Sequence, residues 1–259
     1  MSKQAGTAAS RPRDWDAELY HRVSDFQFGL GLEVLDRLVL RGDETVLDAG
    51  CGTGRVTRVL VERLPRGQVI AVDASEDMVR KARETLPGSV ELRTMDLAEL
   101  EVDEPVDAIL STAVFHWILD HDRLFARLYA ALRPGGALAA QCGGEGNVAT
   151  VAEAIRGVRE TEPFAPHLGG WEGPWRFPST DDAAGRLRGA GFHEVRCWLE
   201  PRTLVPEDPS AYLRTVTLGL HLERLPQGLR VPFVDAVLER MAEPVAIDYV
   251  RLNIDARRP

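Results

Sequence analysis

The sequence predicts an α/β fold with a mostly parallel sheet, and two observations support this. Short apolar, β-branched runs alternate with segments of helical periodicity along most of the chain, as in βαβ units. The run that begins at Thr45 then passes through glycines at positions 50, 52 and 54 into a helical pattern that starts at Arg55. A strand, a glycine turn and a helix in this order are typical of a nucleotide-type site at the edge of a parallel sheet.

The spacing of these glycines separates two kinds of site. Glycine lets the backbone approach a ligand with no Cβ in the way, and the start of the next helix offers free N–H groups to an anion. A dinucleotide fingerprint, G-x-G-x-x-G, would need its third glycine at position 55, where Arg55 stands. The pattern is instead Asp48-x-Gly50-x-Gly52-x-Gly54, which disfavours a nicotinamide oxidoreductase.

The composition is that of an ordinary globular protein. The 259 residues are 44% hydrophobic and 27% charged, and a chain of this length can bury a sizeable core. The formal net charge of -9 argues against a nucleic-acid partner, and the sequence leaves the oligomeric state open. Cys51, Cys142 and Cys197 match no zinc spacing and no disulfide framework, which favours a reducing compartment. We expect no metal site, because the acids are spread over separate strand ends and no His/carboxylate pair has ligand spacing. No run is long enough to span a membrane, and residues 1–13 have no apolar signal-peptide core, so we expect a cytoplasmic protein with no membrane partner.

The N-terminal part is expected to contain a tail and two helices. Residues 1–13 are small and polar, which predicts a disordered tail, and residues 14–259 are expected to form a single domain. Apolar residues at helical spacing predict helices over 14–23 and 28–40, the second ended by Arg41-Gly42-Asp43.

The rest of the chain is expected to alternate between strands and helices. Strands are expected at 45–47, 68–73, 90–94, 106–112, 137–142, 192–199 and 245–254. Helices are expected over 55–60, 76–86, 97–100, 124–132, 148–160, 181–190, 209–222 and 232–241. The segment 161–180 is rich in aromatic residues, proline and glycine, which is typical of a loop that covers a binding site; a loop packed on the sheet edge is the alternative.

An acidic residue ends the second expected strand. Asp73 follows the glycines by about twenty residues, which is where this type of fold binds a ribose diol. A carboxylate can accept two hydroxyl hydrogen bonds there, and charged acceptors make the stronger bonds. Asp73 is therefore expected to bind the ribose of the ligand.

Three motifs resemble those of the class I S-adenosylmethionine-dependent methyltransferases. The pattern from Asp48 to Gly54 resembles their motif I, Asp73-Ala74-Ser75-x-x-Met78 adds to the resemblance, and Leu132-Arg133-Pro134-Gly135-Gly136 resembles a common feature of these enzymes. The resemblance implies a Rossmann-like sheet of seven mostly parallel strands with helices on both faces. It implies an antiparallel last strand between strands five and six, and a lid of helices and loop over the acceptor site. It also implies S-adenosylmethionine as the cofactor and S-adenosylhomocysteine as the product.

The resemblance also assigns residues to the cofactor. Tyr20 is expected at the methionine carboxylate, Met78 against the adenine and Asp96 at the adenine amino group. Each has an alternative role: Tyr20 packs its helix to the body, Met78 belongs to the core and Asp96 caps a helix. The full set expected to bind the cofactor is Tyr20, Asp48, Gly50, Gly52, Gly54, Asp73, Ala74, Met78, Asp96, Leu97 and Ser111.

The residues after the fourth strand narrow the resemblance. Phe115-His116-Trp117 resembles the trans-aconitate methyltransferases and juvenile hormone acid methyltransferases, which methylate carboxylates of small acids. His116 is the candidate catalytic residue: it orients a carboxylate or deprotonates a hydroxyl, and the alternative is that it only holds its loop in place. Weaker candidates for the same roles are His167 and His221. The residues expected to bind the substrate are His116, Trp117, Trp175, Arg176 and Arg214, the two arginines because a buried carboxylate needs a cation.

The sequence therefore predicts a methyltransferase that acts on a small molecule, with the carboxylate of a small organic acid as the first choice. A carboxylate is ionised at neutral pH and needs no general base, so positioning can supply most of the acceleration. Segments 143–180 and 201–243 are expected to cover the acceptor site. Two alternatives stay open: the acceptor is a hydroxyl or amine of a secondary metabolite, or the protein is a non-catalytic regulatory protein that binds S-adenosylmethionine.

Overall fold

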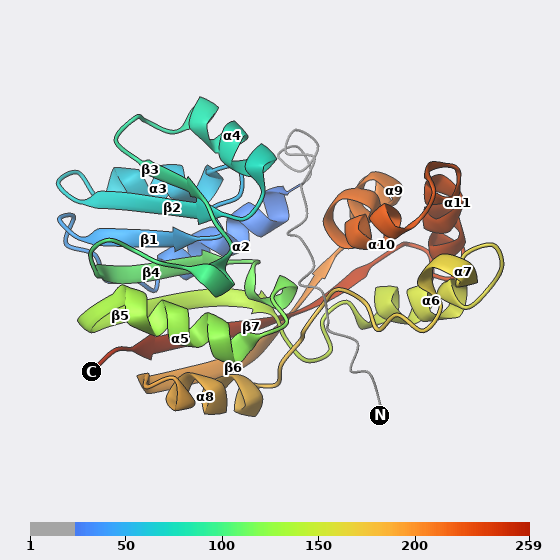
Figure 1. Ribbon diagram of the computed structural model, residues 1–259. Helices are drawn as coiled ribbons and strands as arrows, with labels where there is room; N and C mark the ends of the chain where they lie inside the picture. The colour runs from blue at the N-terminus through green and yellow to red at the C-terminus, as the bar shows by residue number, and fades with distance from the viewer. Residues whose placement is uncertain (1–23) are drawn as a thin grey trace, which may run out of the picture.

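Within residues 24–259, which this computed structural model describes, seven strands form one sheet in the order β3-β2-β1-β4-β5-β7-β6 (Figure 1). The strands are β1 (Thr45–Ala49), β2 (Gln68–Asp73), β3 (Glu91–Thr94), β4 (Val106–Thr112), β5 (Leu132–Gly143), β6 (His193–Leu204) and β7 (Ile247–Arg257). The expected tail over 1–13, the helix over 14–23 and the role of Tyr20 lie outside the described residues.

The direction of the strands confirms the predicted fold class. β1 pairs in parallel with β2 and β4, and the parallel pairing continues to β3 and β5. β7 pairs antiparallel with both β5 and β6. The last strand is therefore the antiparallel one, inserted between strands five and six as expected.

Helices cover both faces of this sheet because the central strands are apolar on both sides. On one face, α2 (Asp25–Leu35) and α3 (Arg55–Arg63) bury Val34 and Leu60 against β1, β2 and β4. On the other face, α5 (His121–Ala131) and α8 (Thr180–Gly189) bury Phe125 and Leu187 against the same strands and β5. Parallel strands buried on both faces show this continuous apolar pattern. α4 (Glu76–Thr85) packs beside β2 and β3.

A second group of helices lies beyond the carboxyl ends of β1, β2 and β4, and we call it the helical lobe (Figure 1). It consists of α6 (Ala149–Arg159), α7 (Ala165–Leu168), α9 (Pro209–Tyr212), the π-helix η3 (Leu213–Thr217), α10 (Gly219–Arg224) and α11 (Gln227–Leu238). The lobe has its own apolar cluster, which includes Ile155, Leu218 and Phe233 and also Tyr249 from the start of β7. β6 and β7 thus continue from the sheet into the lobe.

Two expected helices have wrong boundaries. α2 covers Asp25–Leu35 and not 28–40, because after Leu35 the hydrogen bonds tighten to three-residue spacing while the buried Leu38 continues the apolar pattern. α11 covers Gln227–Leu238 and not 232–241. The expected first residue, Pro232, lies inside α11, which begins five residues earlier.

The expected helix over 209–222 is also wrong as a single element. It consists of α9, the π-helix η3 and α10, because the Leu218 N–H donates to the Leu213 carbonyl at 2.7 Å across five residues. β5 begins at Leu132 rather than 137, because Leu132 pairs with Val106 of β4 before an irregular stretch, and β6 extends to Leu204 rather than 199, because it stays paired with β7 as far as Ile247. The other expected elements are present with shifted ends, and the segment 161–180 contains the short helix α7. In the described part of the chain, no helix has the length and apolarity that a membrane span needs.

Candidate functional site

The glycine loop, residues 50–54, connects β1 to α3 in a backbone conformation that favours glycine. Gly50, Gly52 and Gly54 have φ angles of 91°, 54° and 81°. A Cβ on Gly50 would lie 2.1 Å from Val114 Cγ2, whereas a Cβ on Gly52 would meet nothing within 4 Å. The glycines therefore serve two purposes, close packing beneath the loop at Gly50 and an open face at Gly52.

Asp73 accepts hydrogen bonds both from the glycine loop and from the loop that follows β2. Its Oδ2 accepts a hydrogen bond from the Gly52 N–H at 2.9 Å, and its Oδ1 accepts one from the Ser75 N–H at 2.9 Å. The Ala74 N–H is a third backbone donor to this carboxylate, which has four acceptor sites in all, so acceptor capacity remains for a ligand hydroxyl. Burial raises the pKa of Asp73, and the backbone donors oppose that shift. Asp73 can therefore still accept a hydrogen bond from a ligand beside the open face of the loop.

Asp48 lies beneath the same loop. Its side chain is buried, and its Oδ2 accepts a hydrogen bond from the Thr57 hydroxyl at 2.7 Å. Burial raises the pKa of Asp48 to about 6; the Thr57 bond opposes this shift and the charge of Asp73 adds to it. Two acidic side chains in this position favour a ligand that carries positive charge.

The other expected cofactor residues lie at the same edge of the sheet. Asp96 follows β3 and its side chain accepts from the Ala98 N–H at 2.9 Å, which makes it the N-cap of the 3₁₀ helix η1 (Leu97–Glu99). Met78 is buried on α4, and the Ser111 hydroxyl donates to the Ala49 carbonyl at 2.6 Å. The remaining two residues, Ala74 and Leu97, follow β2 and β3. The adjacent carboxyl ends of β1, β2 and β3 thus gather these residues, while Ser111 links β4 to β1.

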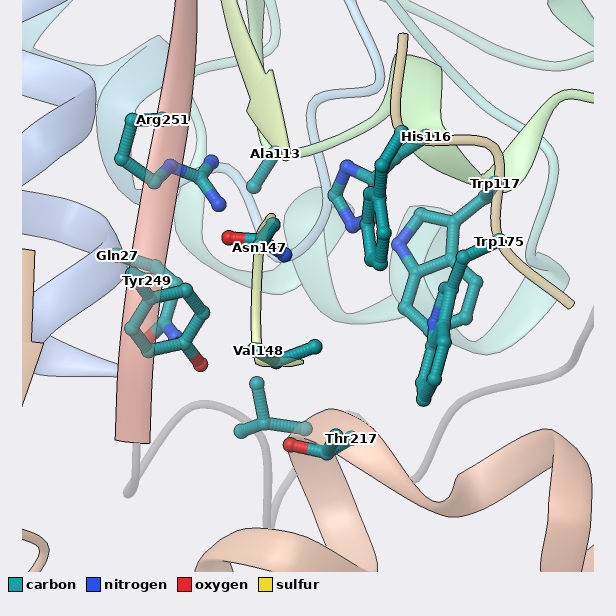
Figure 2. Close-up of a pocket in the computed structure, with 12 residues that line it drawn as sticks. Gln27, Ala113, His116, Trp117, Asn147, Val148, Trp175, Thr217, Tyr249 and Arg251 are labelled. Carbon is teal, nitrogen blue, oxygen red and sulfur yellow. The ribbon is translucent and has the colours of Figure 1, made fainter. Parts of the chain in front are cut away.

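A pocket lies between the sheet and the helical lobe, and we call it the aromatic pocket (Figure 2). It contains about 440 Å³ of space outside the atoms, which includes solvent at its mouth. Its lining residues are Gln27, Ala113, His116, Trp117, Asn147, Val148, Trp175, Phe177, Val216, Thr217, Tyr249 and Arg251. Ala113 directly follows β4, so the pocket begins at the carboxyl end of a central strand, where open α/β sheets bind ligands.

His116 is a neutral hydrogen-bond donor in this pocket. It lies on the 3₁₀ helix η2 (Phe115–Trp117), and its Nδ1 faces the Gly143 N–H at 3.2 Å. A backbone N–H only donates, so Nδ1 must be the acceptor and the proton resides on Nε2. Burial lowers the pKa of His116 well below its usual range, and the positive charge of Arg251 acts in the same direction. In Figure 2 the ring is directed toward Asn147 and Arg251.

Arg251 is the cation of the pocket, and sequence reasoning missed it. It lies on β7 with an exposed fraction of 3%, and its Nε donates to Gln141 Oε1 at 3.3 Å. Figure 2 shows the guanidinium directed toward Ala113. Of the described residues that line the pocket, Arg251 alone carries a full charge, since His116 is neutral. An arginine in the alternating, mostly apolar pattern of 245–254 was the available signal.

The two arginines expected at the substrate lie elsewhere. Arg176 forms an ion pair with Asp182 at 3.1 Å, and Arg214 is exposed on η3; neither lines the aromatic pocket. Trp117 and Trp175 do line it, with ring centroids 6.2 Å apart. His221 lies behind Trp175 at a centroid distance of 5.2 Å, and the half-buried His167 on α7 does not line the pocket.

Comparisons with known proteins show that this chain is similar to methyltransferases. A family described as a methyltransferase domain matches residues 46–136. The trans-aconitate 2-methyltransferase of Methylobacterium nodulans is 34% identical over 187 residues, which cover 72% of this chain and 67% of that protein. The trans-aconitate 2-methyltransferase of Azoarcus sp. is 42% identical over 127 residues, which cover 49% of this chain and only 50% of that protein. An uncharacterized methyltransferase of Schizosaccharomyces pombe is 32% identical, over 70% of this chain and 72% of that protein.

Solved structures share the fold at low sequence identity. A putative methyltransferase in complex with the Haloferax volcanii Trm112 methyltransferase activator has a TM-score of 0.58 and 19% identity, over 96% of this chain and 99% of that chain. Phosphoethanolamine N-methyltransferase 2 of Haemonchus contortus, in complex with S-adenosyl-L-methionine, has a TM-score of 0.59 and 20% identity, over 94% of this chain and 56% of that chain.

Proposed function

Because the chain belongs to the class I S-adenosylmethionine-dependent methyltransferases, we propose that it transfers a methyl group from S-adenosylmethionine to a carboxylate oxygen of a small organic acid. The relatives named for a tricarboxylic acid support an organic acid as the acceptor. Several of these matches cover about half of the relative, so the acceptor is argued from the pocket itself.

The glycine loop and its acids fit the cofactor. The open face at Gly52 gives the backbone room to approach a ligand, and the Asp73 carboxylate keeps acceptor capacity for a ribose hydroxyl beyond its backbone donors. Asp48 and Asp73 suit the positive charge of a sulfonium and an ammonium group. When bound, S-adenosylmethionine supplies a methyl group on a sulfonium, which a carboxylate oxygen can accept without a prior proton transfer.

One observation carries the choice of acceptor: Arg251 and His116 both line the aromatic pocket, and the bond from the Gly143 N–H to Nδ1 leaves the proton of the neutral His116 on Nε2. Two donors, one of them charged, can hold and orient a carboxylate. A hydroxyl or amine acceptor would instead be helped by a base, and a neutral His116 with its proton on Nε2 presents none to the pocket. A purely regulatory protein would not need a pocket with these donors. We therefore assign His116 and Arg251 to the acceptor carboxylate.

We also propose that residues 14–259 act as one methyltransferase domain with a cover over the acceptor. Segment 143–180 contributes Asn147, Val148, Trp175 and Phe177 to the pocket, and segment 201–243 contributes Val216 and Thr217. Both expected covering segments therefore supply lining residues, although neither of the arginines first assigned to them does. This supports a site that is completed from two distant parts of the chain.

The first experiment is a calorimetric titration with S-adenosylhomocysteine, followed by a methyl-release screen over carboxylic acids, phenols and amines. We expect micromolar binding and turnover on acids. Asp73→Ala should weaken binding of S-adenosylhomocysteine by about tenfold, because a charged partner of the ribose is lost. Turnover confined to phenols or amines, or no binding at all, would contradict the proposal.

A pair of arginine variants tests the acceptor assignment. Arg251→Met should raise KM for the acid by at least about tenfold because the carboxylate loses its cation, with affinity for S-adenosylhomocysteine unchanged. Arg214→Met is the matched control, since Arg214 is exposed and lies outside the pocket. Equal effects of the two variants would exclude Arg251 from the acceptor site.

A further inference from the structure

The side of the aromatic pocket that faces Arg251 is a wall of flat rings. Trp117, Trp175 and Phe177 line it, each half-buried, so each leaves apolar surface open to the pocket. Trp175 and Phe177 stack with ring centroids 5.7 Å apart and an interplanar angle of 19°. Figure 2 shows Trp117 and Trp175 on one side of the pocket and Arg251, Gln27 and Tyr249 on the other.

This wall is held in place from behind. His221 lies between Trp175 and Trp171, with centroid distances of 5.2 Å and 5.0 Å, and it stacks on Phe233 in the core of the helical lobe. His221 is buried, and burial lowers its pKa to about 3, so it adds no charge to the wall. A wall with fixed rings can bind a flat ligand with little loss of conformational entropy.

Among the residues that the structure describes, the pocket has full charge at one place only. Arg251 is the single full charge among the described lining residues, while the apolar Val148 and Val216 line the pocket on the side of the helical lobe. A tricarboxylate such as aconitate could place one carboxylate at Arg251, and its other two would then meet no second cation among the described lining residues, only neutral side chains such as Asn147, Thr217 and the indole rings. A buried carboxylate without a cation or convergent donors is costly.

Building on the proposed function, we propose that the acceptor is a monocarboxylic acid with a flat aromatic or conjugated body. The carboxylate lies at Arg251 and His116, and the body stacks against Trp117 and Trp175. A single negative charge matches a single cation, and the ring faces contribute by offset stacking and by burial of apolar area. The acceptor therefore differs in class from the tricarboxylate that gives the bacterial relatives their name.

The test compares acids of the two classes on the intact protein. Initial rates and calorimetric binding, both with saturating cofactor or its product, are measured for cinnamate, indole-3-acetate, butyrate and trans-aconitate. We expect kcat/KM for the aromatic acids to exceed that for trans-aconitate by at least about tenfold, because each favourable pocket contact is worth a factor of this order. A preference for trans-aconitate would overturn the inference and leave the proposed function standing. Methylation of phenols or amines alone would overturn both.

Variants of the wall provide a second readout. Trp175→Ala should lower kcat/KM for cinnamate by at least about tenfold and change that for butyrate by less than about twofold. Trp175→Phe keeps a ring and should recover most of the activity on cinnamate. Trp198→Phe is the control, since Trp198 lies on β6 against Arg37 and Arg196 and outside the pocket. Equal losses on cinnamate and butyrate in Trp175→Ala would contradict stacking as the source of the preference.

Discussion

Asp48 and Asp73 both lie at the glycine loop, and burial raises the pKa of each, so both are protonated more readily in the folded chain than in the unfolded chain. The pKa of Asp48 is raised from 3.8 to about 6, mainly by burial. Between these two values the folded state binds more protons than the unfolded state, so stability falls as the pH rises through this window and is level above it. Binding of a cationic ligand above the loop should favour the charged form of Asp48.

Asp48→Asn tests this account at a single residue. The amide oxygen can still accept the hydrogen bond from Thr57, while the buried charge is gone. We expect the variant to be more stable than the parent at pH 7, by about 2 kcal/mol, with a flatter pH dependence between pH 4 and 6. Urea unfolding at several pH values measures both effects. The exposed Asp36→Asn serves as the control, and a less stable Asp48→Asn at pH 7 would refute the assignment.

Substitutions of Gly50 and Gly52 can separate the contribution of these glycines to packing from their contribution to ligand binding. Both have positive φ, but only a Cβ on Gly50 would collide with Val114. Gly50→Ala should destabilise the fold by at least about 3 kcal/mol, because left-handed strain and overpacking add. Gly52→Ala should cost about 1 kcal/mol in stability and should mainly weaken S-adenosylhomocysteine binding. Unfolding curves measure the stability of the two variants, and titrations measure their affinity for S-adenosylhomocysteine. A Gly52→Ala variant less stable than Gly50→Ala would be incompatible with the geometry.

At the scale of single elements, the sheet was more predictable than the helical lobe. The expected strands 68–73 and 106–112 match β2 and β4 residue for residue, because a buried strand bounded by turn residues has a local signature. The boundaries of α2 and α11 could not be predicted from such a local sequence signature. Apolar spacing continues past the end of α2 and through Pro232 in α11, so packing and not local sequence decides where hydrogen bonds stop.

The functional site likewise has a part that could be predicted from the sequence and a part that could not. The glycine loop, Asp73 and Asp96 follow consecutive strands, and parallel pairing brings them to one edge of the sheet, so their proximity followed from the sequence. Arg251 reaches the pocket from β7; the place of this strand beside β5 was expected, but the sequence alone does not show which of its side chains line a pocket against the helical lobe. Arg176 could not be excluded beforehand, because its pairing with Asp182 requires the position of α8 relative to the preceding loop.

The π-helix η3 contains two buried threonines, Thr215 and Thr217, whose substitutions can be compared. Both are buried; the Thr215 hydroxyl donates to the Ala211 carbonyl at 2.8 Å, whereas Thr217 Oγ1 has no hydrogen-bond partner among the described residues. Thr217→Val should raise the stability of the ligand-free protein by about 1 kcal/mol, since a buried unpaired hydroxyl is removed. Thr215→Val should lower it by a similar amount. Thermal unfolding measures both, and destabilisation by Thr217→Val would show that its hydroxyl is satisfied.

The whole molecule consists of a cofactor-type sheet and a helical lobe joined by two long strands. β6 and β7 pair with each other from His193 to Leu204, and Tyr249 near the lobe end of β7 belongs to the lobe's apolar cluster. The aromatic pocket takes His116 and Arg251 from the sheet side and Val148 and Thr217 from the lobe. A ligand in this pocket therefore touches both parts at once, whereas a ligand on the glycine loop touches the sheet side alone.

This division predicts two separate patterns of amide hydrogen exchange. S-adenosylhomocysteine should slow exchange in the glycine loop and at the start of α4, because a bound ligand suppresses local opening of the segments it contacts. Addition of an acid acceptor such as cinnamate should then slow exchange in α6 and η3, which carry or adjoin the lobe residues of the pocket. α5 and α8 cover the far face of the sheet and should not respond to the acid, which makes them the internal control. Protection by the acid confined to the glycine loop would place the acceptor outside the aromatic pocket, whereas protection of α6 and η3 would show that the lobe closes the site around the acid.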